Sequence, residues 1–194
     1  MCSLTDRTSG RAQRRPEEKR ARLLEAARSI FGETGYGASV HDICRAAGVG
    51  IGTFYHQFPD KAELMRQLMD QEHEYRISGF EALADADDPA AEVVRILAGS
   101  NPALVRAMVE ACGIDPRLRE FARDLRRETQ ERLAASLERV RAARGSRSPA
   151  VDASTAAWAT LALGDAFTEQ AAPEAARIVN ILAFAETDGA RVRA

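Results

Sequence analysis

The chain has 194 residues, of which 45% are hydrophobic, which is enough for one large domain or for a small domain and a medium one. It has no apolar run of the roughly 18 residues that a membrane helix needs, and its polar, basic N-terminus lacks the apolar stretch of a secretion signal, so a cytoplasmic protein is expected. The three cysteines are scattered and fit neither a metal motif nor a disulfide framework, so neither a metal site nor a cofactor is expected.

The net charge of −2 is unevenly distributed along the chain. Residues 1–66 hold 11 Lys and Arg against 8 Asp and Glu, whereas the remainder holds 16 against 21. A basic N-terminal part joined to an acidic remainder fits a protein that presents one end to nucleic acid. A bias of this size is also common in proteins with other functions.

The first part of the chain divides into an arm and a helix. Residues 1–18 are polar, rich in Arg, Ser and Thr, and contain Pro16, and we interpret them as a flexible basic arm. The arm could reach a minor groove of DNA or could simply be a solvated tail. From Glu17 onward, apolar residues recur at three- and four-residue steps, as expected for an amphipathic helix that ends at Gly35.

Two short helices are expected next, over about 39–47 and 51–58. Ser39 is a suitable N-cap for the first helix, and Gly48 is a suitable residue to end it. Small apolar contacts between the two helices would come from Val40, Ile43, Ala47, Val49 and Phe54. Two short helices joined at such a turn are typical of a helix-turn-helix, in which the second helix enters a major groove.

The remainder of the chain is also expected to be helical. A long helix should follow Pro59-Asp60 and run to about residue 83. Asp or Asn before Pro marks three later helix starts. The helices expected after the long one cover about 89–98, 102–113, 116–144, 150–171 and 173–187. No segment shows the clean alternation of a strand, so the expected fold class is all-α.

Residues 20–61 carry an ordered, gap-free series of motifs. After Arg20 these are Leu23-Leu24-x-Ala26-Ala27, Phe31, Gly35-Tyr36, Val40-x-Asp42-Ile43, Ala46-Ala47-Gly48-Val49, Gly52-Thr53-Phe54-Tyr55 and Phe58-x-x-Lys61. The series resembles the DNA-binding domain of the TetR family of transcriptional regulators. The resemblance implies an N-terminal three-helix helix-turn-helix domain over residues 19–62 and a C-terminal helical ligand-binding and dimerisation domain over residues 63–194. Gly50 departs from the Ser or Thr that is usual in the family, and Gln57 stands where the family often has His.

By position, the resemblance implies DNA contacts from Ser39, Gly50, Ile51, Thr53, Tyr55, His56 and Lys61. Thr53, Tyr55 and Lys61 match positions that contact phosphates, and Ser39 could add a backbone N–H contact to a phosphate. Gly50 and Ile51 would face the bases, where they offer little hydrogen bonding and at most an apolar contact, such as one to a thymine methyl group. Alternatively, His56 could be solvated surface and Tyr55 could belong to the core.

The C-terminal helices give weaker signals. Stripes of small and apolar residues near 153–171 and 173–187 suit a four-helix homodimer interface, although an intramolecular core would show the same pattern. Candidates for a ligand pocket are Tyr75, Phe80, Met108, Cys112, Trp158 and Asp165. For each of these residues, plain core packing is the alternative.

These observations predict a sequence-specific DNA-binding transcriptional regulator. We expect a repressor that dissociates from a palindromic double-stranded operator when it binds a small, mostly apolar effector. The alternative is a ligand-independent helical DNA-binding or interaction module. An enzyme is not expected, because the sequence has no Ser/His/Asp set, metal cluster or phosphate loop, and its three histidines all lie before residue 75.

Overall fold

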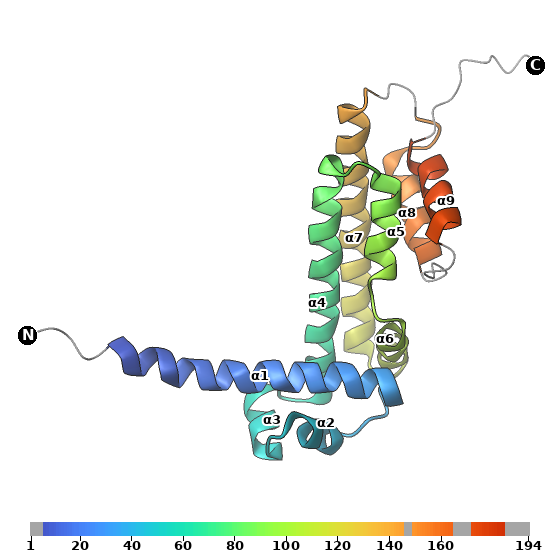
Figure 1. Ribbon diagram of the computed structural model, residues 1–194. Helices are drawn as coiled ribbons and strands as arrows, with labels where there is room; N and C mark the ends of the chain where they lie inside the picture. The colour runs from blue at the N-terminus through green and yellow to red at the C-terminus, as the bar shows by residue number, and fades with distance from the viewer. Residues whose placement is uncertain (1–5, 146–148, 165–171, 185–194) are drawn as a thin grey trace, which may run out of the picture. The chain divides into compact units, whose positions relative to one another are not determined.

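The computed structural model describes residues 6–145, 149–164 and 172–184, and all the regular elements of these residues are helices. In chain order they are α1 (Asp6–Thr34), α2 (Val40–Ala47), α3 (Ile51–Gln57), α4 (Lys61–Glu81), the 3-10 helix η1 (Ala82–Asp85), α5 (Pro89–Ala98), α6 (Pro102–Ile114), α7 (Pro116–Ala143), α8 (Ala153–Gly164) and α9 (Ala172–Phe184) (Figure 1). The expected all-α fold class is confirmed. None of the described helices is both long and apolar enough to span a bilayer.

The helices begin where the sequence places capping residues. The Ser39 hydroxyl accepts the Asp42 N–H at 3.1 Å, and the Asp88 carboxylate accepts the N–H groups of Ala90 and Ala91. The Asn101 side chain does the same for α6, accepting the Ala103 N–H at 2.9 Å. Each cap satisfies backbone donors that have no partner inside the first turn, so short local signals were sufficient to predict these starts.

The beginning of α1 differs from the expected arm over residues 1–18. The helix already begins at Asp6, with Pro16 inside it, and residues 1–5 lie outside the described residues. Pro16 removes one N–H donor from the helix. Arg, Ala and Gln, which favour helix, make up residues 11–15 ahead of it and can sustain helical backbone.

The described residues fall into two compact units, and the functional border expected at residue 62 stays a prediction. Of the described residues, 6–70 and 101–122 form the N-terminal unit, and 71–100, 123–145, 149–164 and 172–184 form the C-terminal unit. Segment 101–122 joins the N-terminal unit because α6 packs on α1. The contact is close at Gly32, where an added Cβ would lie 3.8 Å from the Ala103 side chain. The sequence pattern around 101–122 carries no local sign of this pairing.

The core of the N-terminal unit is aromatic. Phe31, Phe54 and Phe58 are fully buried, and the ring centres of Phe54 and Phe58 lie 5.7 Å apart. Leu23, Ala27, Ile43, Leu64 and Met65 are also fully buried in this unit. The helix-turn-helix is therefore held between α1 and the first turns of α4 by burial of large apolar side chains.

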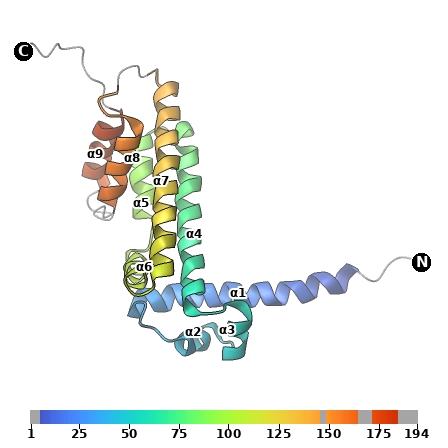
Figure 2. The ribbon, with the colours of Figure 1, turned by 180° about the vertical axis from the view of Figure 1, so that it is seen from behind.

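The C-terminal unit has its own core, formed mainly by α5, α8 and α9 together with apolar side chains from α4 and α7. Figure 2 shows α5, α8 and α9 side by side from the reverse direction. Fully buried members include Phe80, Val93, Leu133, Ala157 and Val179.

Arg141 of α7 is a charged side chain inside this unit, with only 3% of its surface exposed. Its Nε donates to the Ala183 carbonyl at 2.7 Å, and its Nη2 donates to the Val151 carbonyl at 2.8 Å. Its Nη1 also lies 3.3 Å from the Glu138 carboxylate. One guanidinium thus connects the end of α9 and the segment before α8 to α7.

We predict that Arg141→Met lowers the free energy of unfolding by about 2–4 kcal/mol, because the apolar stem remains while buried carbonyls lose a charged donor. The matched control is Arg126→Met, the same change at an exposed position of α7. Urea unfolding followed by circular dichroism measures both variants. Equal urea midpoints for the two variants would show that the contacts of Arg141 do not stabilise the fold.

Candidate nucleic-acid interface

Helix α3 has two sharply different faces. Phe54 is fully buried, whereas Ile51 is 50% exposed and Tyr55 is 57% exposed. Gly52 and His56 are exposed as well. Tyr55 therefore does not belong to the core, and its ring meets the edge of Phe54 with centres 5.3 Å apart. The exposed face combines residues that the resemblance assigns to DNA contacts.

The turn between α2 and α3 depends on Gly48. This residue has φ of 61° and ψ of 40°, the left-handed conformation that glycine adopts without a steric penalty. Its N–H donates to the Arg45 carbonyl at 3.2 Å, and the Val49 N–H donates to the Cys44 carbonyl at 3.0 Å. This arrangement closes α2 and sends the chain directly into α3.

Two arginines of α1 bind the C-terminal ends of these helices. Arg22 donates to the Ala47 carbonyl and, at 3.3 Å, to the Gly48 carbonyl. Arg20 donates to the Gln57 carbonyl at 2.9 Å, and its guanidinium carbon lies 4.6 Å from the centre of the Phe58 ring. The last carbonyls of a helix have no partner within it and carry partial negative charge, so a cation there is doubly favourable. The sequence pattern does not indicate that Arg20 and Arg22 bind the ends of these helices.

Lys61, a predicted phosphate contact, binds the segment between α1 and α2. Its ammonium donates to the Tyr36 carbonyl at 2.7 Å and to the Ala38 carbonyl at 3.1 Å, and lies 4.3 Å from the centre of the Tyr36 ring. Burial lowers the pKa of Lys61. An ammonium has three N–H donors, so these carbonyls leave one for another acceptor. The side chain fixes the segment that leads into α2.

Ser39 and Gly50 occupy the starts of α2 and α3. Besides accepting the Asp42 N–H, the Ser39 hydroxyl donates to the Asp42 carboxylate at 2.6 Å, and this bond is the main reason that the pKa of Asp42 is lowered. Gly50 caps α3 without any side-chain bond. Thr53, the remaining predicted contact, is half-buried on α3.

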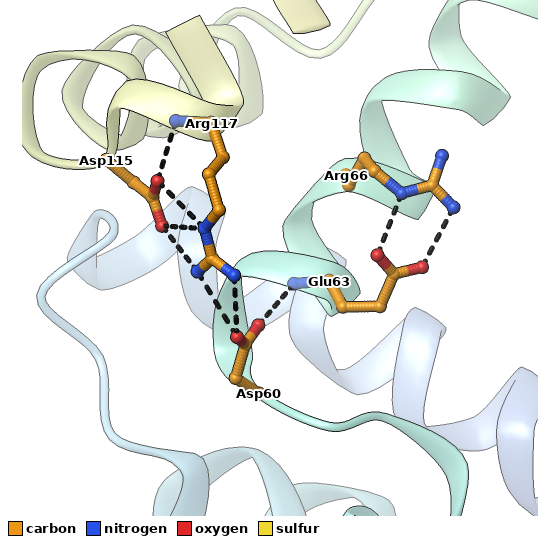
Figure 3. A network of polar contacts seen from close by, with 5 residues as sticks. All are labelled: Asp60, Glu63, Arg66, Asp115 and Arg117. Carbon is orange, nitrogen blue, oxygen red and sulfur yellow. Dashed lines mark hydrogen bonds and ion pairs between the residues drawn. The ribbon is translucent and has the colours of Figure 1, made fainter.

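A polar network joins the start of α4 to the start of α7 (Figure 3). The Asp60 carboxylate accepts the Glu63 N–H at 2.8 Å, and the Asp115 carboxylate accepts the Arg117 N–H at 2.8 Å. The Arg117 guanidinium then contacts Asp60 at 3.1 Å and Asp115 at 2.8 Å. Its hydrogen bonds are the main reason that the pKa of Asp115 is lowered. One exposed guanidinium therefore links the caps of two helices.

Helix α6 makes a second polar contact with the motif. The Glu110 carboxylate accepts the Tyr36 N–H at 3.0 Å, next to Gly35, whose φ is 75°. Residues 101–122 thus touch the segment before α2 through Glu110 and the start of α4 through Arg117. No pattern in the sequence indicates either contact.

Five of the six pocket candidates lie among the described residues. Phe80 is fully buried in the core of the C-terminal unit, while Trp158 is 58% exposed and Tyr75 is 42% exposed. Met108 and Cys112 belong to the N-terminal unit, and Asp165 lies outside the described residues. Their role in binding a ligand stays a prediction.

We predict that Lys61→Met lowers the free energy of unfolding by about 1 kcal/mol, because the Tyr36 and Ala38 carbonyls lose their donor. If the remaining N–H reaches a phosphate, as the resemblance implies, DNA binding should also depend less on salt. The slope of log affinity against log salt concentration should become shallower by about one unit. Lys19→Met, at an exposed position of α1, is the control for stability. An unchanged slope together with lower stability would assign Lys61 an internal role alone.

Comparison with known proteins gives a consistent result. A family model described as "Bacterial regulatory proteins, tetR family" matches residues 23–68. The HTH-type transcriptional regulator EthR of Mycolicibacterium smegmatis is 30% identical over 167 residues, which cover 79% of this chain and 77% of the relative. The HTH-type transcriptional regulator UidR of Escherichia coli K12 is 36% identical over 69 residues, 35% of either chain.

Solved structures share the fold. Salmonella enterica GusR superimposes with a TM-score of 0.68 at 24% identity, covering 84% of this chain and 91% of that one. The TetR family transcriptional regulator PfmR of Thermus thermophilus superimposes with a TM-score of 0.63 at 21% identity, covering 83% of this chain and 96% of that one. The relatives are regulators of transcription, which confirms the prediction of a regulator rather than an enzyme. With a helix-turn-helix match in its N-terminal unit and a relative aligned over most of its length, this chain belongs to the TetR family of DNA-binding transcriptional regulators.

Proposed function

We propose that this regulator is a homodimeric repressor that binds a palindromic operator and leaves it when a small, mostly apolar ligand binds. The observation that carries the proposal is the exposed face of α3, where Ile51 and Tyr55 point away from a fully buried Phe54. A helix that anchors one face in an aromatic core and leaves the other bare is suited to enter a major groove.

The proposed contacts divide by chemistry. Thr53, Tyr55 and Lys61 bind phosphates through hydroxyls and an ammonium, and the backbone at Ser39 offers an N–H to a further phosphate. Phosphate contacts fix the position of the protein on the duplex without reading its sequence. The bases are read by the start of α3, at Gly50 and Ile51, and His56 adds a contact from the same exposed face.

Exposed apolar side chains on α8 and α9 support the homodimer. Trp158 is 58% exposed, Ile178 is 43% exposed and Ile181 is 63% exposed, while Ala157 and Val179 of the same helices are buried in their own core. Large apolar groups exposed on neighbouring helices favour association, and a two-fold pair of identical copies is the simplest closed solution. The seven-residue α3 is also too short to specify an operator alone.

A buried polar atom in the C-terminal unit supports a ligand site. Thr160 of α8 is 1% exposed, and its hydroxyl has no hydrogen-bond partner within the described part of the chain. An unpaired hydroxyl in an apolar interior is costly, and a bound ligand with one polar group would satisfy it. The core of the same unit is built largely from alanine, valine and leucine, which favours a ligand that is otherwise apolar.

We predict that the chain sediments as a dimer at micromolar concentration and selects a palindromic site from random duplexes, with half-sites about 34–36 Å apart. Ile181→Glu should yield monomers that bind the palindrome weakly, because a charge would be buried in the interface. Val109→Glu, at another exposed apolar position, should remain dimeric. Recovery of sequences without symmetry, or a monomer at all concentrations, would contradict the dimer.

We predict that a ligand found by thermal-shift screening lowers operator affinity about 5- to 150-fold, and that saturating operator lowers ligand affinity by the same factor. Thr160→Val preserves the shape of the side chain but removes the hydroxyl. This variant should bind the ligand more weakly and bind the operator with unchanged affinity. A compound that binds free and operator-bound protein equally is not the effector. Failure of a broad apolar library to raise the melting temperature would favour a ligand-independent module.

A further inference from the structure

The glycines at positions 50 and 52 have no role that the fold itself requires. The described glycines with positive φ are Gly35, Gly48 and Gly145, and Gly50 has an ordinary φ of −74°. A Cβ added at Gly50 or at Gly52 would meet no atom within 4 Å. Nothing in the described part of the chain therefore prevents a larger residue at either position.

Both glycines also make α3 less stable than it could be. Gly50 caps the helix without a side-chain acceptor for the free N–H groups of the first turn. Gly52 lies within the helix, where glycine loses more conformational freedom than any other residue. A seven-residue helix gains from every cap and every favourable residue. Bare backbone at these positions suits a partner outside the chain that approaches α3 closely.

The surface between the glycines carries a single side chain. Ile51 is 50% exposed, and its neighbours on either side present only backbone. The branched hydrocarbon of Ile51 can neither donate nor accept a hydrogen bond. On the base edges of a major groove, donors and acceptors dominate, and the one apolar group is the C5-methyl of thymine.

On the basis of the DNA-binding role proposed for α3, we propose that Gly50 and Gly52 allow base edges to approach the backbone of α3, so that Ile51 selects thymine by packing on its methyl group. Cβ atoms at the glycine positions would hold the duplex away from the helix. Other bases would place polar groups, or no methyl group, against the hydrocarbon and lose their hydration without replacement. The selectivity is for thymine at one position in each half-site.

The test uses the palindrome that the full-length protein selects from random duplexes, with each thymine replaced in turn by deoxyuridine. Deoxyuridine pairs like thymine but lacks the methyl group. A single replacement, in one half-site, should weaken wild-type binding about fourfold, which is the value of one buried methyl group. Ile51→Ala should bind the thymine and deoxyuridine duplexes equally, with other thymines unaffected.

The glycines are tested by Gly50→Ser and Gly52→Ala. Both variants should unfold at higher temperature than the wild type and bind the selected duplex at least tenfold more weakly. The control is Gly113→Ala on α6, where an added Cβ also meets nothing within 4 Å and where operator affinity should be unchanged. Wild-type affinity in both glycine variants would overturn the close approach.

The outcomes separate this inference from the function on which it rests. If no sequence is enriched from the random duplexes, the proposed operator recognition fails. If a palindrome is enriched but no single deoxyuridine weakens binding, or if the weakening persists in Ile51→Ala, recognition stands and thymine selection by Ile51 is overturned.

Discussion

Helices of eight and seven residues, such as α2 and α3, cannot persist alone in water, because the cost of the first turn is recovered only over a longer helix. Each also ends in carbonyls that find no partner within the helix. In this chain the missing donors come from α1: Arg22 reaches the end of α2, 25 positions away, and Arg20 reaches the end of α3, 37 positions away. The surface that we propose to meet DNA therefore depends on guanidinium groups of another helix.

This dependence changes the meaning of the basic N-terminal charge. Arg20, Arg22 and Lys61 count among the cations of the first 66 residues, yet the structure places them on backbone carbonyls and aromatic rings. Their charge therefore stabilises the motif itself. Glu110 and Arg117 hold segment 101–122 on the same motif. A rearrangement of that segment must break or distort contacts at both ends of the helix-turn-helix.

Local signals predicted most of the fold. Ser39, Asp88 and Asn101 cap helices because their own side chains reach the next turn, and Gly48 ends α2 because its φ is positive. Partnerships across the sequence could not be predicted: nothing near Arg22 distinguishes it from a solvated residue such as Lys19. Among the candidate site residues, Ile51, Tyr55 and His56 share the exposed face of α3. Pocket residues are harder to single out from sequence, because an apolar residue type serves core, surface and pocket equally.

Amide hydrogen exchange of the full-length protein tests most directly whether Arg20 and Arg22 of α1 stabilise α2 and α3. In a variant carrying Arg20→Ala and Arg22→Ala, the amides of α2 and α3 should exchange faster than in the wild type, while those of α5 and α9 keep their protection. Arg126→Ala is the control for removal of an arginine in general. Unchanged protection of α2 and α3 in the double variant would show that the aromatic core alone holds these helices and would contradict the account.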